Sequence, residues 1–264
     1  MMDFPELQAR FRALPPLPPV QQLDTWGKHR RSLRQHVESS TTMDDFLRWS
    51  TVVATMFLGD TPAVQEEWQA LAAADRARWT CATLDPGIGG ADRLPYAPHT
   101  NGNLVHQAYH LHQWENATAR RVDRLGSIVE FGGGYGAMAL VCRQLGFKGQ
   151  YTIFDLPEFS LLQQYYLAAC GIADVGWANS KEVLYMSTDL FIACYSIAEV
   201  AADERRKFIP PVCGAYLFAA ADNWDGIDNN EWFEEYITWR PCVKWTKVYN
   251  DIAPGHWYLM GVRE

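Results

Sequence analysis

Hydrophobic and polar residues repeat with two different periods along the chain, and the change falls near residue 127. Before it, apolar residues recur at helical spacing in four stretches, which predicts a mostly helical N-terminal region. These stretches are 24–37, 42–58, 63–79 and 103–122. Residues 81–102 are rich in Gly and Pro and are expected to form a loop.

After residue 127, short apolar runs alternate with helical patterns. The runs predict strands over 127–131, 150–155, 174–178, 189–195 and 214–221. The patterns between them predict helices over 136–146, 158–170, 180–186 and 199–208. This alternation predicts an α/β fold with a Rossmann-like, doubly wound, mostly parallel sheet. A last helix over 229–239 precedes strands over 243–249 and 256–262, which predict a C-terminal antiparallel hairpin.

Composition narrows the class of protein. The chain has 264 residues, of which 48% are hydrophobic, and its formal net charge is −8. A nucleic-acid-binding face needs a surplus of Lys and Arg, so no nucleic-acid partner is expected. The six cysteines lack zinc-like spacing, and no secretory signal or membrane-spanning stretch is seen. We therefore expect a cytoplasmic protein with reduced, buried thiols, no metal and no membrane partner.

The stretch SIVEFGGGYGAMALVCRQLG at 127–146 combines a strand, a glycine loop and a helix. As G-x-G-x-x-A, through Gly132, Gly134 and Ala137, it fits the dinucleotide-binding fingerprint. As E-x-G-x-G-x-G, beginning at Glu130, it resembles the first motif of class I S-adenosylmethionine-dependent methyltransferases. Both ligands need a close approach to the backbone, so the glycines alone leave both open.

Charge separates the two interpretations. A dinucleotide places its pyrophosphate at the N-terminus of the helix after the loop, where Glu130 would oppose it. S-adenosylmethionine has no phosphate, and its ammonium and sulfonium suit a carboxylate. Asp155 ends the second predicted strand and can accept hydrogen bonds from ribose hydroxyls in either case. Leu156 is then expected beside the adenine.

A family resemblance follows from VEFGGGYG together with FDLPE at 154–158. Over roughly residues 100–200 the chain resembles class I methyltransferases of small molecules, and in particular bacterial proteins described as sugar O-methyltransferases. The resemblance implies that S-adenosyl-L-methionine is the cofactor. It also implies a helical cap over 1–126 that shapes the acceptor pocket, and a catalytic core over 127–264.

The resemblance assigns cofactor-binding roles to residues at the ends of the strands. Glu130 faces the methionine part, Gly132 and Gly134 pass beneath it, and Asp155 holds the ribose. Asn179 and Ser180 lie by the adenine after the third strand, and Tyr195 and Ser196 border the methyl group after the fourth. These residues complete the cofactor-binding set with Leu156.

The general base is less well defined. Plant-type O-methyltransferases carry a histidine after the fourth strand, where this chain has CYSIAEV and no histidine. Glu199 in that segment either binds a substrate hydroxyl or caps the next helix. His256, at the mouth of the predicted hairpin, is either the base or an ordinary turn residue. Glu199 and His256 are the two residues predicted to be catalytic.

Five more residues are predicted to bind substrate. His106 and His110 lie four residues apart on one helical face beside Tyr109. A metal site would need a third ligand, and the sequence offers no obvious one, so no metal is expected. This helix either covers the ligand or is purely structural. Asp222 and Asn223 end the fifth predicted strand, where they line the crevice or form a turn.

The sequence therefore predicts a methyltransferase that acts on a hydroxyl, amino or guanidino group of a small polar metabolite, such as a sugar or a natural-product intermediate. The alternatives are an NAD(P)-dependent oxidoreductase and a non-catalytic protein with the methyltransferase fold. The small-molecule acceptor is the expected partner, and the cap is a candidate surface for homodimer contacts.

Overall fold

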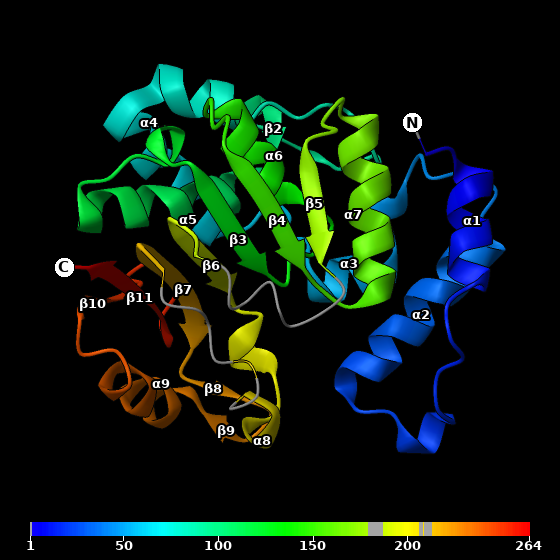
Figure 1. The fold of residues 1–264 in the computed structure, drawn as a ribbon. Helices are drawn as coiled ribbons and strands as arrows, with labels where there is room; N and C mark the ends of the chain where they lie inside the picture. The colour runs from blue at the N-terminus through cyan, green and yellow to red at the C-terminus, as the bar shows by residue number, and fades with distance from the viewer. Residues whose placement is uncertain (1, 179–186, 206–207, 209–212) are drawn as a thin grey trace.

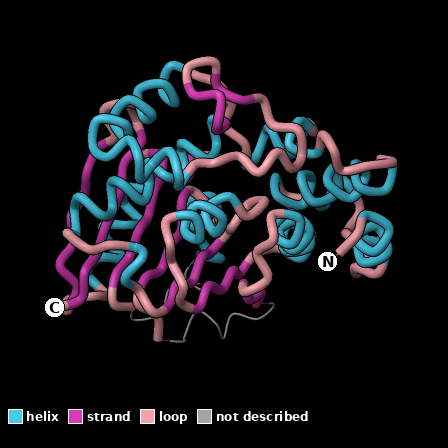
Figure 2. Tube along the Cα trace, turned by 90° about the horizontal axis from the view of Figure 1, so that it is seen from above, coloured by secondary structure: helices cyan, strands magenta, loops and turns pink. Residues whose placement is uncertain are grey.

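A seven-stranded sheet forms the centre of the molecule, with helices on both of its faces (Figures 1 and 2). The computed structural model describes residues 2–178, 187–205, 208 and 213–264. The strands lie in the order β10-β11-β7-β6-β3-β4-β5. Their bounds are β3 Ser127–Phe131, β4 Gln150–Phe154, β5 Val175–Ala178, β6 Leu190–Cys194, β7 Ala215–Ala221, β10 Val243–Tyr249 and β11 His256–Arg263.

The sheet is mostly parallel. β3 pairs in parallel with β4 and β6, and β4–β5 and β6–β7 are parallel too. β11 is antiparallel to both β7 and β10. The predicted fold class, with its C-terminal hairpin, is confirmed. Because β3, β4 and β6 lie side by side, their carboxyl ends converge at one edge of the sheet.

Successive residues of the central strands point to opposite faces, as the two-residue period of a strand requires. In β6, Leu190 and Ile192 pack in one hydrophobic cluster while Phe191 and Ala193 pack in the other. The first cluster joins the sheet to the N-terminal helices and to α6 Ala137–Gln144 and α7 Pro157–Ala169. The second lies between the sheet and α9 Asn229–Thr238.

The N-terminal region is mainly helical, as predicted. Its helices are α1 Phe4–Arg12, α2 Thr25–Ser39, α3 Ser50–Thr55, α4 Pro62–Ala82 and α5 Gly102–Thr118. Most begin at a side chain that caps the first turn, such as Asp24 for α2 and Asn101 for α5. α1 and α2 pack against α7 at one end of the molecule, opposite the hairpin (Figure 1).

Several predicted elements differ in the structure. The helix expected over 42–58 is broken into the 3-10 turn η2 Phe46–Arg48 and the short α3, because Trp49 between them has extended backbone. The helix over 199–208 is wrong: η5 Ile197–Glu199 and the four-residue α8 Ala202–Arg205 occupy its described part. The helix predicted over 180–186 falls outside the described residues.

Two small antiparallel pairs were not predicted. β1 Arg93–Leu94 and β2 Ala97–Asn101 lie inside the expected loop, and β8 Asn223–Trp224 pairs with β9 Ile227–Asp228. Strands this short leave almost no periodic signal in the sequence.

The cysteines are all free, and two of the six contradict the expectation of burial. Cys142 and Cys213 are buried, whereas Cys81 and Cys242 are exposed. Among the described helices, none has the length and apolar character that crossing a bilayer requires.

Candidate active site

The glycine loop follows β3 directly and turns sharply into α6. Gly132, Gly134 and Gly136 all have positive φ, at 76°, 58° and 104°. A Cβ on Gly132 would lie 2.3 Å from Cβ of Ser196, and one on Gly134 would lie 3.2 Å from Cβ of Met56. Glycine is therefore favoured at Gly132 and Gly134 for two reasons: it adopts positive φ without strain, and it has no Cβ to collide with these neighbours. The absence of side chains also leaves the loop backbone open to a ligand.

Glu130 lies at the end of β3 with its side chain buried and its residue only 5% exposed. The Tyr151 hydroxyl donates a hydrogen bond to its Oε2 at 2.8 Å. Burial raises the pKa of Glu130 to about 8, against the effect of this hydrogen bond, and the nearby Asp155 raises it further. A cation bound beside this carboxyl group would lower its pKa and favour the ionised form.

Asp155 follows β4, the neighbouring strand. Its Oδ1 accepts from the Leu156 backbone N–H at 2.7 Å, and its Oδ2 accepts from Gln163 Nε2 at 2.6 Å. Burial raises its pKa to about 7, although these hydrogen bonds and those from the Gly133 and Gly134 backbone favour ionisation.

A cavity of about 1130 Å³ opens at this edge of the sheet. The predicted cofactor-binding residues that line it are Glu130, Gly132, Gly134, Asp155, Leu156, Tyr195 and Ser196. Pockets that hold one drug-sized ligand measure about 300–1,000 Å³. The cavity therefore has room for a cofactor together with a small acceptor.

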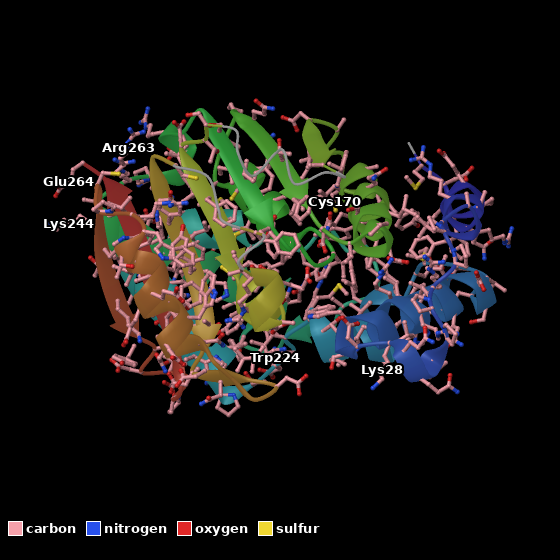
Figure 3. The ribbon with its side chains drawn as sticks, turned by 60° about the horizontal axis from the view of Figure 1, so that its bottom comes forward. Lys28, Cys170, Trp224, Lys244, Arg263 and Glu264 are labelled. Atoms are coloured by element: carbon pink, nitrogen blue, oxygen red, sulfur yellow. The ribbon has the colours of Figure 1, made fainter. Side chains whose placement is uncertain are left out.

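The charge of this lining is one-sided. Five carboxylic acids line the cavity, and within the described part of the chain no Lys or Arg does. The acids are Asp24, Glu130, Asp155, Glu199 and Glu204. Three cations labelled in Figure 3, Lys28, Lys244 and Arg263, are exposed and lie at the periphery of the molecule. The lining formed by the described residues therefore suits a cation and contributes no Lys or Arg that could pair with a phosphate.

The N-terminal region closes one side of the cavity. Helix α3 ends at Thr55, and residues 56–58 run over the glycine loop and line the cavity. Asn103 of α5 fixes this segment, because its Oδ1 accepts from the Leu58 N–H at 3.3 Å and its Nδ2 donates to the Tyr135 hydroxyl at 3.0 Å. The segment 56–58 and Tyr135 of the glycine loop are thus joined through the amide of Asn103.

The end of β6 forms the opposite wall. Tyr195 has φ +64°, which is costly for a residue with a side chain, and this conformation places it in the lining. The Ser196 hydroxyl donates to the Phe131 carbonyl and links this wall to the end of β3. Burial raises the pKa of Glu199 to about 8, opposed by the charge of Arg205.

The predicted substrate-binding and catalytic residues separate in the structure. His106 and Glu199 line the cavity, whereas Tyr109, His110 and His256 lie outside the lining that the described residues form. His256 contacts the lining through its Nδ1, 3.0 Å from the Tyr195 hydroxyl, and burial lowers its pKa. Their predicted roles stay predictions.

Asp222 and Asn223 also lie outside the described lining. Asn230 Nδ2 donates to Asp222 Oδ1 at 3.0 Å, and Asn223 is exposed at the start of β8. Both occupy the turn region before α9, and their binding role remains a prediction. Asn179 and Ser180 fall outside the described residues.

One residue of this region was not predicted. Glu67 of α4 is 1% exposed, and its Oε1 lies 2.8 Å from Nδ1 of His106. Its signal is visible in the sequence, because Glu67 shares a helical face with the buried Val64, Trp68 and Leu71. A carboxylate on an apolar face is costly unless it is paired.

Comparisons with known proteins give structural matches only. No protein-family model matches the chain, and no curated protein does. The chain is similar in structure to an O-methyltransferase family protein from Burkholderia thailandensis, at 13% identity and TM-score 0.46, over 76% of this chain and 71% of that one. It is also similar to the N-methyltransferase NodS from Bradyrhizobium japonicum WM9, at 14% identity and TM-score 0.44, over 60% of this chain and 94% of that one.

A third similar structure is the ribosomal protein L11 methylase from Lactobacillus delbrueckii subsp. bulgaricus, at 16% identity and TM-score 0.43, over 61% of this chain and 79% of that one. At such identities, and with TM-scores below 0.5, nothing about substrate or activity is taken from these structures, and the ligand has to be identified from the site itself.

Proposed function

We propose that this protein transfers a methyl group from S-adenosylmethionine to a small polar acceptor. The observation that carries the proposal is the pair Glu130 and Asp155, at the ends of adjacent parallel strands beside an open glycine loop. Around them the described lining holds five acids and neither Lys nor Arg. A ligand with an ammonium and a sulfonium matches this charge.

The residues present fit the cofactor. Glu130 would accept from its ammonium and Asp155 from its ribose hydroxyls, while Gly132 and Gly134, which carry no side chain, would let its methionine part approach the loop backbone. When bound, S-adenosylmethionine supplies an electrophilic methyl group on a good leaving group. The protein has to orient the acceptor, exclude water and, for a hydroxyl, take up a proton.

The second part of the proposal is that the acceptor is a small molecule enclosed by a helical cap. Residues 1–126 would form the cap and 127–264 the core, and residues 56–58 of the cap would enclose the acceptor together with Tyr195. A cavity closed in this way suits a small molecule as the partner. The net charge of −8 argues in the same direction, since a nucleic acid would meet a repulsive field.

Calorimetric titration tests this function. S-adenosylhomocysteine and S-adenosylmethionine should bind with micromolar or tighter affinity, and NAD⁺ and NADP⁺ should not bind. Tight binding of a dinucleotide without binding of the sulfur nucleosides would favour the oxidoreductase. Cofactor binding with no methyl transfer to any compound in a broad metabolite screen would favour the non-catalytic alternative.

A further inference from the structure

A cluster of polar side chains lies next to the cavity, between the cap and the core. Its members come from α4, α5, β11 and the position directly after β6, and they are Glu67, His106, His110, Tyr195, His256 and Tyr258. We call them the polar cluster. Three hydrogen-bonded pairs build it: Glu67 with His106 at 2.8 Å, His110 with Tyr258 at 2.9 Å, and Tyr195 with His256 at 3.0 Å.

The pairs are packed against one another. The ring centroids of His106 and His110 are 4.2 Å apart, and the His106 ring is stacked on Tyr195 at 6.2 Å. His110 is fully buried, and its burial, together with the two other histidines, holds its pKa well below the usual value. A neutral His110 therefore lies beside His106.

The polar cluster is incompletely satisfied. Glu67 Oε2 and His110 Nε2 are buried and have no hydrogen-bond partner within the described part of the chain. Buried polar atoms in folded proteins are nearly always paired, and each unpaired one costs about 1–3 kcal/mol. Two such atoms lie in one cluster beside the cavity, although neither Glu67 nor His110 belongs to its described lining.

Resting on the proposed function, we infer that His106 is the general base for methyl transfer to a hydroxyl group, and that Glu67 is its positioning residue. Of the three histidines in the polar cluster, His106 is the one in the described cavity lining, and its side chain is 15% exposed. A carboxylate only accepts hydrogen bonds, so the contact with Glu67 places the proton of His106 on Nδ1. In the neutral imidazole with this tautomer, the lone pair is on Nε2.

The step balances without another reactant. An electron pair of the acceptor oxygen forms the bond to the methyl carbon, and the carbon–sulfur bond breaks with its pair remaining on sulfur. The hydroxyl proton moves to Nε2 of His106, and the imidazolium that results is stabilised by Glu67. The products are a methyl ether and a thioether, and His106 then returns its proton to water.

The same geometry argues for a hydroxyl rather than an amine. A neutral amine attacks with its own lone pair and loses its proton afterwards, whereas an alcohol is a poor nucleophile until its proton is removed. An imidazole that a buried carboxylate holds in one tautomer can remove the proton of an alcohol, so the site suits a hydroxyl acceptor. His256 is less suited, because its Nδ1 is paired with Tyr195 and it lies outside the described lining.

The experiment compares His106→Gln and Glu67→Gln with His112→Gln. His112 lies on the same helix, where it contacts Asn116 and Trp79 instead of the polar cluster. Methyl-labelled S-adenosylmethionine is offered with methyl α-D-glucopyranoside, methyl α-L-rhamnopyranoside and myo-inositol as hydroxyl acceptors, and with putrescine and agmatine as nitrogen acceptors. Calorimetry with S-adenosylhomocysteine is run on every variant.

We expect transfer to at least one hydroxyl acceptor and to neither nitrogen acceptor. His106→Gln should lower kcat roughly 10²- to 10⁴-fold with unchanged cofactor affinity. Glu67→Gln should lower kcat less, with little change in acceptor KM, and ¹⁵N NMR should show its His106 ring losing the single Nδ1–H tautomer. His112→Gln should match the wild type in all of these measurements.

Other results contradict the inference while leaving the proposed function intact. Transfer to the nitrogen acceptors alone, or to none of the hydroxyl acceptors by protein that binds cofactor, would do so. Full turnover of His106→Gln would remove it as the base, as would a large loss in His256→Gln alone. Failure of all variants and the wild type to bind S-adenosylhomocysteine would instead count against the proposed function.

Discussion

The Tyr151 hydroxyl donates a hydrogen bond to Glu130 across two neighbouring strands, at 2.8 Å and in full burial. Tyrosine keeps its proton here, because burial and the adjacent carboxyl raise its pKa well above the usual value. The pair therefore holds a carboxyl group that faces the cavity, with at most one unit of negative charge on it. A cationic ligand bound next to Glu130 would favour the ionised form of this carboxyl group.

Cofactor binding should therefore depend on pH. Without ligand, burial raises the pKa of Glu130 to about 8 and that of Asp155 to about 7, so both are largely protonated at pH 6. A cation favours the ionised forms, so binding should release protons and the Kd should fall as pH rises from about 6 to 8.5. Each proton released contributes up to about a tenfold change per pH unit.

Titrations in buffers of different ionisation enthalpy measure the released protons directly. Glu130→Gln should bind more weakly and release fewer protons than the wild type. A Kd that is constant between pH 6 and 8.5, with no proton release, would show that Glu130 does not face the positive part of the ligand and that binding does not favour the ionised form of Asp155.

Replacing Asp155 tests the ribose contact. Asp155→Asn keeps the shape of the side chain but replaces one acceptor oxygen and the charge. Hydrogen bonds to a charged group are worth about 1.5–3 kcal/mol, so S-adenosylhomocysteine should bind roughly 10- to 100-fold more weakly by calorimetry. Asp225→Asn is the matched control, because Asp225 is exposed in the turn between β8 and β9. Equal affinities for the two variants would rule out the ribose assignment.

The sequence predicted the core of this fold well because each strand and helix there carries its own signal. Leu190 to Ala193 alternate between two buried faces, and the apolar run in the sequence reflects this double burial. The strand–loop–helix at 127–146 gave the predicted cofactor-binding residues Glu130, Gly132 and Gly134 for the same local reason. Glu130, Gly132 and Asp155 lie at fixed offsets from strand ends, and their neighbours along the chain are their neighbours in space.

The rest of the site depends on contacts between distant segments, which a local pattern cannot show. Glu67 and His106 are 39 residues apart, and only the packing of α4 on α5 brings them together. The position of Met56 over Gly134 depends on where α3 ends. The predicted helix over 42–58 hid that end, since its apolar spacing continues through the break at Trp49.

Gly132→Ala should disrupt the loop more than its backbone conformation alone requires. Gly132 and Gly146 both have positive φ, at 76° and 96°, where alanine costs about 1–2 kcal/mol. A Cβ at Gly146 meets nothing within 4 Å, whereas one at Gly132 lies 2.3 Å from Ser196 Cβ. Gly146→Ala is thus the control for strain without collision.

Urea unfolding and calorimetry separate these effects. Both variants should be destabilised, Gly132→Ala by at least about 1 kcal/mol more because of the added overpacking. Only Gly132→Ala should lose affinity for S-adenosylhomocysteine. If Gly146→Ala lost as much affinity, the effect would be global and not a property of the loop.

The attachment of the cap gives the last prediction. Glu158 lies in the first turn of α7 and its side chain is 0% exposed, while Arg30 and Arg34 of α2 reach it from the N-terminal region. Arg30 Nε donates to Oε2 and Arg34 Nε to Oε1, each at 2.7 Å. Burial alone would raise the pKa of Glu158, but these hydrogen bonds outweigh it and hold the pKa below its usual value.

Glu158→Gln removes the charge that both arginines share. Breaking a buried pair from one side costs 3–5 kcal/mol, and we expect about 3 because the arginine side chains are 25% and 14% exposed. Urea unfolding at pH 7 measures this loss. Glu38→Gln, at an exposed position of α2, should change stability by less than about 0.5 kcal/mol.

The sign of the pH dependence makes this prediction specific. A carboxyl whose pKa is lowered by folding stabilises the protein above its unfolded pKa, and that contribution is lost as pH falls through the folded pKa. The difference in stability between wild type and Glu158→Gln should therefore be largest near neutral pH and shrink below about pH 4.5.

Because one hydrophobic cluster includes residues of cap and core alike, both should unfold in a single transition. A separate early transition of the cap in Glu158→Gln would show that the two regions are stabilised independently.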